Sequence, residues 1–378
     1  MLYFCCVISS SMQKSGISKP TLIIDASRAK ANIQRMKAKA EAQGAVFRPH
    51  FKTHQSGVVG QWFRQKGIDR ITVSSVSMAS YFADHGWDDI LIAFPVNLLE
   101  IKKINELAGR IKLYVLIEDL AVAKQLDNLL EHLVGVYIKI DSGAGRTGIP
   151  LDDENRVLEF ADQINVSKNI RLKGLLTHAG HFYHQPGGKT AIAEKTQQIN
   201  QKMKALKSKL RKEDLVLSWG DTPSCSMLDD LKGFDEWRPG NFVYYDVMQY
   251  HIGSCSLGDI AVAMACPVVA VHPEREEMVI YGGSVHFSSE FIAADQGFRL
   301  YGYLVKFTEK GWTTPLPGAW LARLSQEHGI VKLPKEICQQ YKPGDLIGIL
   351  PVHSCITVSA IGRQHDLDGN LIPKMVSI

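Results

Sequence analysis

The feature that most constrains the fold is a repeated alternation of short apolar runs with longer amphipathic stretches. Runs typical of strands lie at residues 21–24, 71–73, 90–93, 113–117, 136–140, 172–177 and 215–218. Stretches with helical spacing lie at residues 27–43, 119–130, 154–164 and 191–210, with Ser27 as the expected N-cap of the first. About eight such alternations favour an α/β fold with a parallel (β/α)8 barrel of the TIM type, although the periodicity also fits an open sheet.

The pattern changes after residue 246. Strand-like runs at residues 260–265, 268–272, 278–281, 346–350 and 356–361 are joined by Gly, Pro and Asp turns, with only short helical stretches between them. This texture is typical of a mainly β domain. We therefore expect an N-terminal extension at residues 1–20 with Met12 as an alternative start, a barrel at 21–246, and a mainly β domain at 247–378.

Composition excludes several classes of protein. Of the 378 residues, 45% are hydrophobic and 22% are charged, which is ordinary for a folded globular protein. Lys and Arg exceed Asp and Glu by only 4 and form no dense block, so we expect no nucleic-acid partner. No apolar run reaches the roughly 18 residues of a membrane span. Seven scattered cysteines do not form a disulfide framework, so we expect a cytoplasmic protein without a membrane partner.

The first segment that could carry chemistry is RPHFKTH at residues 48–54, just past a short apolar pair. Active sites of parallel barrels gather at the carboxyl ends of the strands, where Lys52 would lie between His50 and His54. Partial burial beside cationic groups lowers the pKa of a lysine, which makes it a nucleophile. A surface lysine in a loop is the alternative on spacing alone.

Two loops follow later predicted barrel strands. DSGAGRTG at residues 141–148 combines glycines, which let the backbone approach a ligand, with the rigid donor fork of Arg146; a tight turn explains the glycines equally well. THAGHFYH at residues 177–184 contains three histidines at intervals of three. Such spacing gives one face only in a helix, so this loop favours site-lining residues over a zinc site, with Tyr183 as a hydrogen-bonding or acid/base group.

Two further segments predict anion and metal contacts. SWGDTPS at residues 218–224 offers amides and hydroxyls suited to a phosphate, and it also fits an N-capping turn at Asp221 or Thr222. In PVHSC at residues 351–355, a strand would place His353 and Cys355 on one face. Imidazole and thiolate form half of a zinc site, whereas a buried cysteine beside a histidine with other partners is the alternative.

Taken in order, these segments resemble the D-threonine aldolase and D-serine dehydratase-like family of pyridoxal-phosphate (PLP) enzymes, which have the alanine-racemase type of fold. RPHFKTH is the most specific match. HAGHFY at 178–183, WRPGNFVYYD at 237–246, LSQEHG at 324–329 and PVHSC support it. The resemblance runs from about residue 21 to the C-terminus and implies a PLP-binding barrel followed by a β domain.

The resemblance also implies roles for individual residues. Lys52 would be the Schiff-base lysine, with His50 and Tyr183 as further catalytic groups. Further cofactor contacts would come from Arg146, at the pyridine nitrogen, and from His178, Tyr183, Ser218, Gly220, Asp221, Thr222 and Tyr245. His353 and Cys355 would bind a divalent metal near the β-hydroxyl of the substrate, zinc ahead of manganese or magnesium.

The implied activity is a metal-assisted lyase for small β-hydroxy-D-amino acids such as D-serine or D-threonine. A metal at that hydroxyl serves either loss of hydroxide, as in a dehydratase, or cleavage of Cα–Cβ, as in an aldolase. Cys355 resembles the ligand of the D-serine dehydratases, whereas the aldolases have Asp. An amino-acid racemase is the alternative, a non-catalytic PLP carrier is a third reading, and the resemblance implies a homodimer.

One segment departs from the family. Members often carry an Asp-Ala-Gly-x-Lys-like stretch where this chain has Tyr-Gly-Gly-Ser-Val-His at residues 281–286. If that segment lines the site, its changed polarity would change the preferred substrate.

Overall fold

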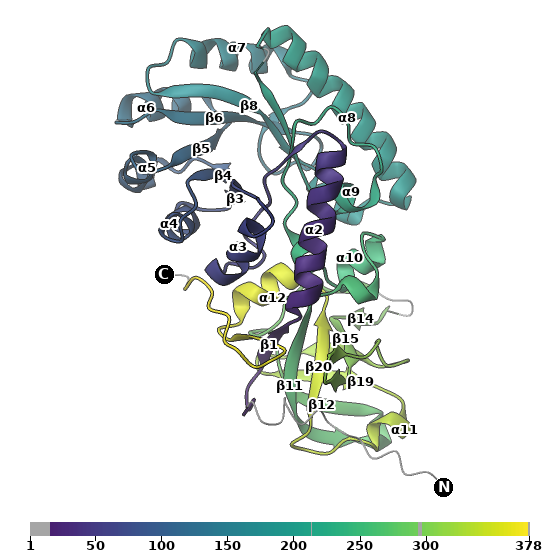
Figure 1. Ribbon diagram of the computed structural model, residues 1–378. Coiled ribbons are helices and arrows are strands. Elements are labelled where there is room, and N and C mark those ends of the chain that lie inside the picture. The colour runs from purple at the N-terminus through teal and green to yellow at the C-terminus, as the bar shows by residue number, and fades with distance from the viewer. Residues whose placement is uncertain (1–15, 213, 294–296, 377–378) are drawn as a thin grey trace.

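Two sheets organise the part of the chain that the computed structural model describes, which is residues 16–212, 214–293 and 297–376. A parallel sheet with helices around it forms one half, and a mainly antiparallel sheet forms the other (Figure 1). This confirms the predicted fold class. Most of the expected N-terminal extension, including Met12, lies outside the described residues.

The parallel sheet has the strand order β2-β10-β9-β8-β6-β5-β4-β3, with β7 (Ile149–Pro150) beside β6. These strands are β2 (Val46–Phe47), β3 (Ile71–Val73), β4 (Asp89–Pro95), β5 (Lys112–Ile117), β6 (Val134–Asp141), β8 (Ile170–His178), β9 (Val216–Gly220) and β10 (Glu236–Trp237). The two edges meet just past β2, where His50 forms a parallel bridge with Thr72 and the Phe51 N–H donates to the Thr72 carbonyl at 2.8 Å. Successive barrel strands are therefore neighbours around a closed ring.

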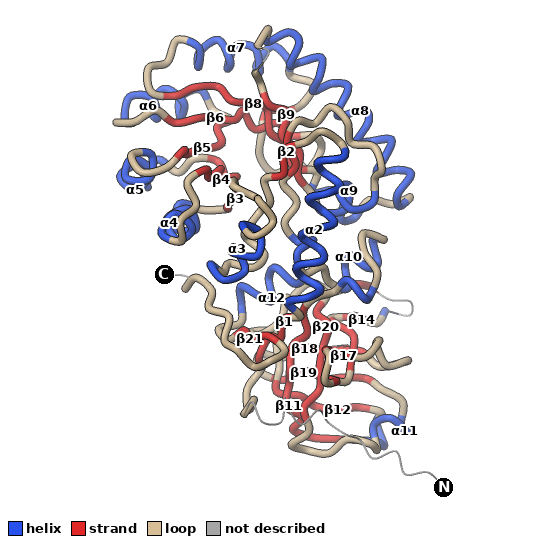
Figure 2. Tube along the Cα trace, in the orientation of Figure 1, coloured by secondary structure: helices blue, strands red, loops and turns tan. Residues whose placement is uncertain are grey.

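Helices connect the strands and cover the outside of this sheet (Figure 2). They are α3 (Gly57–Arg64), α4 (Val76–Asp84), α5 (Ile101–Ala108), α6 (Leu120–Leu129), α7 (Glu154–Asn165), α8 (Gly188–Leu210) and α9 (Thr222–Met227). Several begin at a side-chain cap; for example, Asp119 accepts from the Val122 N–H and Asp153 from the Arg156 N–H. In α7, Val157, Phe160 and Ile164 recur at helical spacing and are buried.

The antiparallel sheet has the order β12-β19-β18-β15-β20-β11-β1-β21, and β12 also pairs with β11. Its strands are β1 (Thr21–Ile24), β11 (Val262–His272), β12 (Glu277–Tyr281), β15 (Gly302–Val305), β18 (Trp320–Leu324), β19 (His328–Lys332), β20 (Leu346–Pro351) and β21 (Gln364–Asp366). Smaller elements here are α10 (Val247–Ile252), β13 (Ile292–Ala293), β14 (Arg299–Leu300), β16 (Phe307–Thr308), β17 (Gly311–Trp312) and α11 (Lys335–Cys338).

Three expectations need correction. The strand at residues 21–24 forms, but it pairs with β11 and β21 rather than in the barrel, and α2 (Ala26–Ala42) then leads to β2. The N-cap of α2 is Asp25, not Ser27, because the Asp25 carboxylate accepts from the Arg28 N–H. Residues 356–361 do not form a strand; most lie in α12 (Ser354–Ala360), where the His353 carbonyl accepts from the Thr357 N–H. The boundary at residue 246 stays a prediction.

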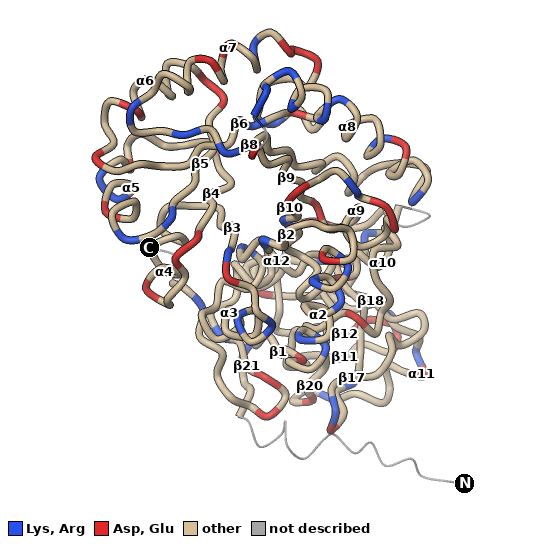
Figure 3. Tube along the Cα trace, turned by 45° about the horizontal axis from the view of Figure 1, so that its top comes forward, with Lys and Arg blue, Asp and Glu red and all other residues tan. Residues whose placement is uncertain are grey.

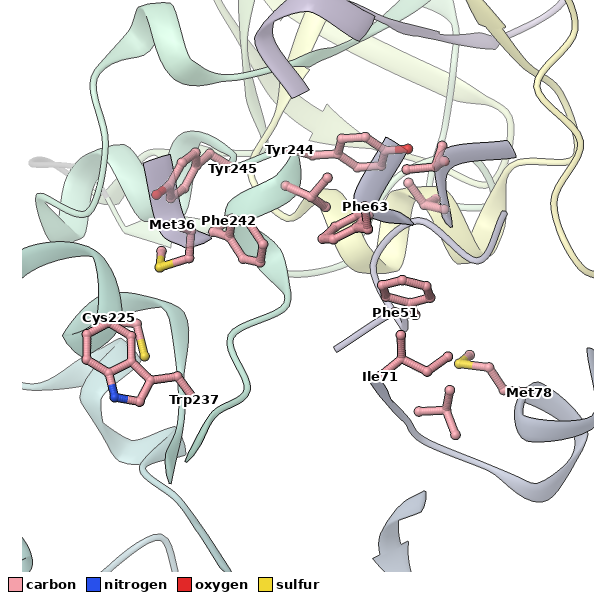
Figure 4. Packing of buried hydrophobic residues seen from close by; sticks show 14 of the residues in the cluster. Met36, Phe51, Phe63, Ile71, Met78, Cys225, Trp237, Phe242, Tyr244 and Tyr245 are labelled. Atoms are coloured by element: carbon pink, nitrogen blue, oxygen red, sulfur yellow. The ribbon is translucent and has the colours of Figure 1, made fainter. Parts of the chain in front are cut away.

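Aromatic packing fixes the segment that carries Lys52. The rings of Phe51 and Phe63 lie 4.8 Å apart between centroids, and those of Phe63 and Phe242 lie 6.2 Å apart. All three side chains are buried in one cluster (Figure 4). The turn after β2 is thereby held against both α3 and the segment after β10.

Among the described residues, no helix has the length and apolar character needed to cross a membrane.

Candidate active site

A cavity of about 470 Å³ opens at the carboxyl ends of the parallel strands, facing α12. Nine residues that the sequence singled out line it: His50, Lys52, Arg146, His178, Tyr183, Asp221, Thr222, His353 and Cys355. They come from four barrel loops and from the start of α12. The fold therefore brings residues separated by up to about three hundred positions into one site.

Lys52 enters this cavity from the turn between β2 and α3. Its backbone N–H donates to His50 Nδ1 at 3.3 Å, so His50 carries its proton on the other ring nitrogen. Burial and the positive charge of Lys52 hold the pKa of His50 well below its ordinary value. His50 is therefore a neutral neighbour of the Lys52 amine.

His178 is a second neutral imidazole beside Lys52. Burial first, and then the charge of Lys52, hold its pKa well below the ordinary value. Its Nδ1 lies 2.6 Å from the Gly220 carbonyl oxygen, which can only accept, so Nδ1 carries the proton. Nε2 of this ring makes no hydrogen bond with the described residues and can act as an acceptor.

The turn between β9 and α9 contains the predicted phosphate contacts. Asp221 is the N-cap of α9 and accepts from both the N–H and the hydroxyl of Ser224, each at 2.6 Å. Burial raises the pKa of Asp221 to about 7, although these hydrogen bonds oppose the change. Thr222 follows it along the cavity wall. The cap and the candidate phosphate contacts thus share one turn.

Three predicted cofactor residues do not line the cavity. Ser218 is buried beneath it and bonds to Glu236 and Arg238. The carbonyl of Gly220 accepts from His178 Nδ1. A Cβ added at Gly220 would lie 3.1–3.2 Å from the Arg238 guanidinium. Tyr245 points elsewhere, with its hydroxyl 3.1 Å from that of Ser226.

His353 and Cys355 lie together at the start of α12. His353 Nδ1 lies 2.7 Å from a Glu290 carboxylate oxygen, and the Thr53 hydroxyl lies 3.1 Å from Cys355 Sγ. Burial alone would lower the pKa of His353, but hydrogen bonds to Cys355 and Glu290 raise it to about 11. Burial would raise the pKa of Cys355, yet His353 holds it below its ordinary value. Each group therefore shifts the pKa of the other, so that the imidazole holds a proton more strongly and the thiol less strongly than either would alone.

The two side chains are adjacent for a different reason from the one expected. They do not share a face of a strand; His353 caps α12 and Cys355 lies in its first turn. No set of three or more His, Cys, Asp or Glu side chains arranged to hold a metal occurs among the described residues. A metal at this pair would therefore have two protein ligands and open positions.

Comparison with known proteins places the chain in a family. A family model described as "Alanine racemase, N-terminal domain" matches residues 24–247, more than half of the 378 residues. The chain belongs to this family. A second family model, for a serine dehydratase domain, matches residues 261–365.

Two relatives of this alanine racemase-type chain match over nearly its full length. A D-threo-3-hydroxyaspartate dehydratase of Delftia sp. (strain HT23) is 30% identical over 353 residues, which cover 90% of this chain and 92% of the relative. A D-serine dehydratase of Dictyostelium discoideum is 28% identical over 381 residues, covering 94% and 95%. The solved structure of the Delftia enzyme is similar with a TM-score of 0.85 at 26% identity, covering 96% of this chain and 99% of that chain.

Sequence reasoning missed four residues of the site in this family member. They line the cavity with the predicted ones: Lys139, Arg238, Asn241 and Glu290. Arg238 and Asn241 belong to WRPGNFVYYD, a segment that the sequence singled out only for its resemblance. Lys139 lies inside an otherwise apolar strand, where a lone lysine is a signal that could have found it. No motif near Glu290 in the sequence predicted its contact with His353.

The departing segment at residues 281–286 does not line the cavity. Its backbone bonds to residues 325–327, for example from the Ser284 N–H to the Ser325 carbonyl at 2.7 Å. His286 lies 3.7 Å from a Glu327 carboxylate. Within this chain, therefore, the segment does not set the polarity of the site.

Proposed function

We propose that the protein is a PLP-dependent, metal-assisted lyase of small β-hydroxy-D-amino acids and that it follows the dehydratase branch. The observation that carries the proposal is the meeting of Lys52 with the His353–Cys355 pair in one cavity. A racemase needs no such metal pair. The relatives that match over at least 90% of the chain are named dehydratases, whereas the alanine racemases match about two thirds of it at 23–24% identity.

The residues present fit PLP. The cavity volume lies within the range of about 300–1,000 Å³ typical of small-molecule sites. Asn241 Oδ1 is buried without a hydrogen-bond partner among the described residues, so a bound ligand could donate a hydrogen bond to it. Asp221, with its pKa near 7, is protonated in part at neutral pH and can then donate to a phosphate rather than repel it. When bound, PLP supplies an electron sink for negative charge at Cα.

Lys52 is the amine that we assign to the cofactor. Of the two lysines that line the cavity, Lys139 donates through Nζ to the Ile140 carbonyl at 2.7 Å and is buried in the wall. Lys139 is the competing amine, because burial lowers its pKa to about 8. Lys52 instead lines the cavity with an exposed side chain, and its charge acts on the neutral imidazoles of His50 and His178. Its Nζ is then placed to take the α-proton of a substrate.

Arg238 is a stronger candidate than Arg146 for the pyridine nitrogen. Arg146 is exposed on the glycine-rich loop, whereas Arg238 is buried beneath the cavity and still lines it. Arg238 donates through Nε and Nη2 to Ser218 and to the Thr177 carbonyl, and its Nη1 makes no hydrogen bond with the described residues. Arg146 is left to contact the substrate or the outer edge of the cofactor.

His353 and Cys355 would hold a divalent cation through Nε2 and Sγ. His353 Nδ1 is bonded to a carboxylate, which is the usual arrangement of a metal-binding histidine. An imidazole and a thiolate favour zinc over manganese or magnesium. Such a cation supplies Lewis acidity at the β-hydroxyl. Two similar structures support the pair: a histidine-to-alanine and a metal-free cysteine-to-alanine variant of D-threo-3-hydroxyaspartate dehydratase, substituted two positions apart.

The test is to purify the holoenzyme and incubate it with D-serine, D-threonine and D-threo-3-hydroxyaspartate, with and without a chelator. We expect a 2-oxo acid and ammonia, released only when metal is present. Glycine and an aldehyde would indicate an aldolase, and a change of configuration alone would indicate a racemase. Borohydride reduction followed by peptide mass spectrometry should find the cofactor attached to Lys52. The Lys52→Ala variant should carry no attached cofactor, and Lys139 should carry none in either protein. Product release that is insensitive to the chelator would contradict the metal role.

A further inference from the structure

A buried series of polar side chains crosses the barrel interior and ends at Arg238. Arg48, Ser218, Glu236 and Arg238 are each at most 4% exposed. They lie on or next to neighbouring strands, and Ser218 on β9 is paired in register with Glu236 on β10. We propose that Glu236 is a positioning residue that fixes the Arg238 guanidinium at the cofactor through the hydroxyl of Ser218. This inference rests on the proposed function.

The hydrogen bonds in this series have only one possible direction. The Glu236 carboxylate can only accept, so the Ser218 hydroxyl donates to Glu236 Oε1 at 2.6 Å. The Ser218 oxygen is then an acceptor for Arg238 Nε–H, also at 2.6 Å. The carboxylate therefore orients the hydroxyl, and the hydroxyl orients the guanidinium. Such a series is stronger than its separate bonds, because each bond polarises the next.

Glu236 itself is held from the other side. Arg48 Nε donates to Glu236 Oε2 at 2.6 Å, and Arg48 Nη1 donates to Asp89 Oδ1 at 2.5 Å. The Arg48 guanidinium also lies over the Tyr114 ring, 5.1 Å from its centroid. Both oxygens of Glu236 are thus occupied, and its side chain has no freedom to turn away from Ser218.

Electrostatics gives Glu236 a second effect on Arg238. Within the described ranges, Arg238 forms no ion pair, so no carboxylate contacts this buried cation directly. Burial lowers the pKa of Arg238 to about 10, and the charge of Glu236 is the strongest influence opposing that change. Glu236 therefore offsets part of the effect of burial on the guanidinium, while Nη1 makes no hydrogen bond with the described residues.

The experiment compares Glu236→Gln with Asp89→Asn, since each change removes one carboxylate charge from Arg48. Gln cannot accept from both Arg48 and Ser218, because its amide nitrogen only donates. We expect Glu236→Gln to weaken PLP binding to the apoenzyme about tenfold or more, and to shift the visible absorbance band of the bound cofactor. Asp89 reaches this series only through Arg48. Asp89→Asn should therefore lower the melting temperature, because Arg48 loses a partner, while both cofactor readouts stay at wild-type values.

Ser218→Ala covers the case in which Glu236→Gln does not fold. It keeps both charges and removes only the bridge, and we expect the same loss of affinity and the same spectral shift. The proposal is wrong if Glu236→Gln or Ser218→Ala binds PLP with the wild-type affinity and spectrum while Arg238→Leu does not. If Arg238→Leu also leaves both readouts unchanged, the cofactor assignment itself fails.

Discussion

At the residue scale, two buried ionisable groups next to the cavity, Asp221 and Lys139, have pKa values moved toward neutrality. Burial raises the pKa of Asp221 to about 7 and lowers that of Lys139 to about 8. Each group changes charge near physiological pH for the same reason, which is that a buried site disfavours the charged form. Their effects on stability have opposite dependences on pH.

Asp221 should give the apoenzyme a measurable pH dependence. A carboxyl whose pKa is raised on folding stabilises the fold fully below its unfolded pKa, and this contribution is lost as the pH rises through the folded value of about 7. Asp221→Asn keeps the cap acceptor but cannot ionise. The free energy of unfolding of the wild type should therefore fall relative to Asp221→Asn between about pH 4 and pH 7, by on the order of 4 kcal/mol.

Denaturant titrations of both proteins at several pH values would measure this difference. Asp119→Asn, at the exposed cap of α6, is the matched control, because it makes the same substitution at a cap carboxylate that is exposed. Parallel curves for wild type and Asp221→Asn would show that Asp221 is ionised throughout this range.

Glu290 should strengthen metal binding through His353. Glu290→Gln keeps an acceptor for His353 Nδ1 but removes the charge, so we expect zinc affinity of the apoenzyme to fall about 10- to 100-fold. Competition with a chromogenic chelator measures this directly. The control is Glu327→Gln, which removes a carboxylate near His286 outside the cavity and should leave the affinity unchanged. An unaltered affinity in Glu290→Gln would remove Glu290 from the site.

At the element scale, one carboxylate holds the starts of two helices. Asp246 Oδ1 accepts from the Gln249 N–H at the start of α10. Asp246 Oδ2 accepts from the N–H and hydroxyl of Ser354 in the first turn of α12, and from the Asn241 amide. The position of His353 and Cys355 over the barrel therefore depends on a residue from the segment that follows β10.

Asp246→Ala should consequently destabilise more than the loss of an ordinary cap. We expect a loss of at least about 2 kcal/mol, since two helix starts and buried donors lose their acceptor. Asp119→Ala, which removes a single exposed cap, should cost about 1 kcal/mol. Denaturant unfolding followed by circular dichroism measures both. Equal losses in the two variants would mean that the contact with α12 contributes nothing.

At the scale of the whole molecule, charges of both signs are interspersed over the two halves (Figure 3), consistent with the net charge of +4. Large apolar side chains remain exposed close to the site: Phe94 lines the cavity and is 57% exposed, and Phe291, next to Glu290, is 39% exposed. Exposed aromatic groups near a site are typical of surfaces that a partner covers.

We therefore expect a homodimer in solution with these side chains at its interface. Light scattering after size-exclusion chromatography should give twice the mass of the chain, and Phe94→Glu with Phe291→Glu should shift it toward the monomer. A protein with the same single-chain mass at every concentration would contradict this expectation.

Much of the architecture follows from local patterns. The predicted strand at residues 71–73 is confirmed residue for residue, and the helices at 119–130 and 154–164 are confirmed to within a residue or so. These elements have apolar periods and capping residues close in sequence. The prediction for residues 356–361 failed because β-branched residues favour a strand by local propensity, whereas here the Thr357 N–H donates to the His353 carbonyl and the segment is helical.

The sequence by itself determined the alternation of strands and helices, the turn that carries Lys52, and the histidine–cysteine pair, because each depends on residues close together in the chain. Only the tertiary structure decided that β1 joins the second sheet, that Glu290 reaches His353, and that Arg238 rather than Arg146 is buried beneath the cavity. The physical reason is the same in each case. A pairing between distant segments depends on burial and hydrogen bonding that exist only after the chain has folded.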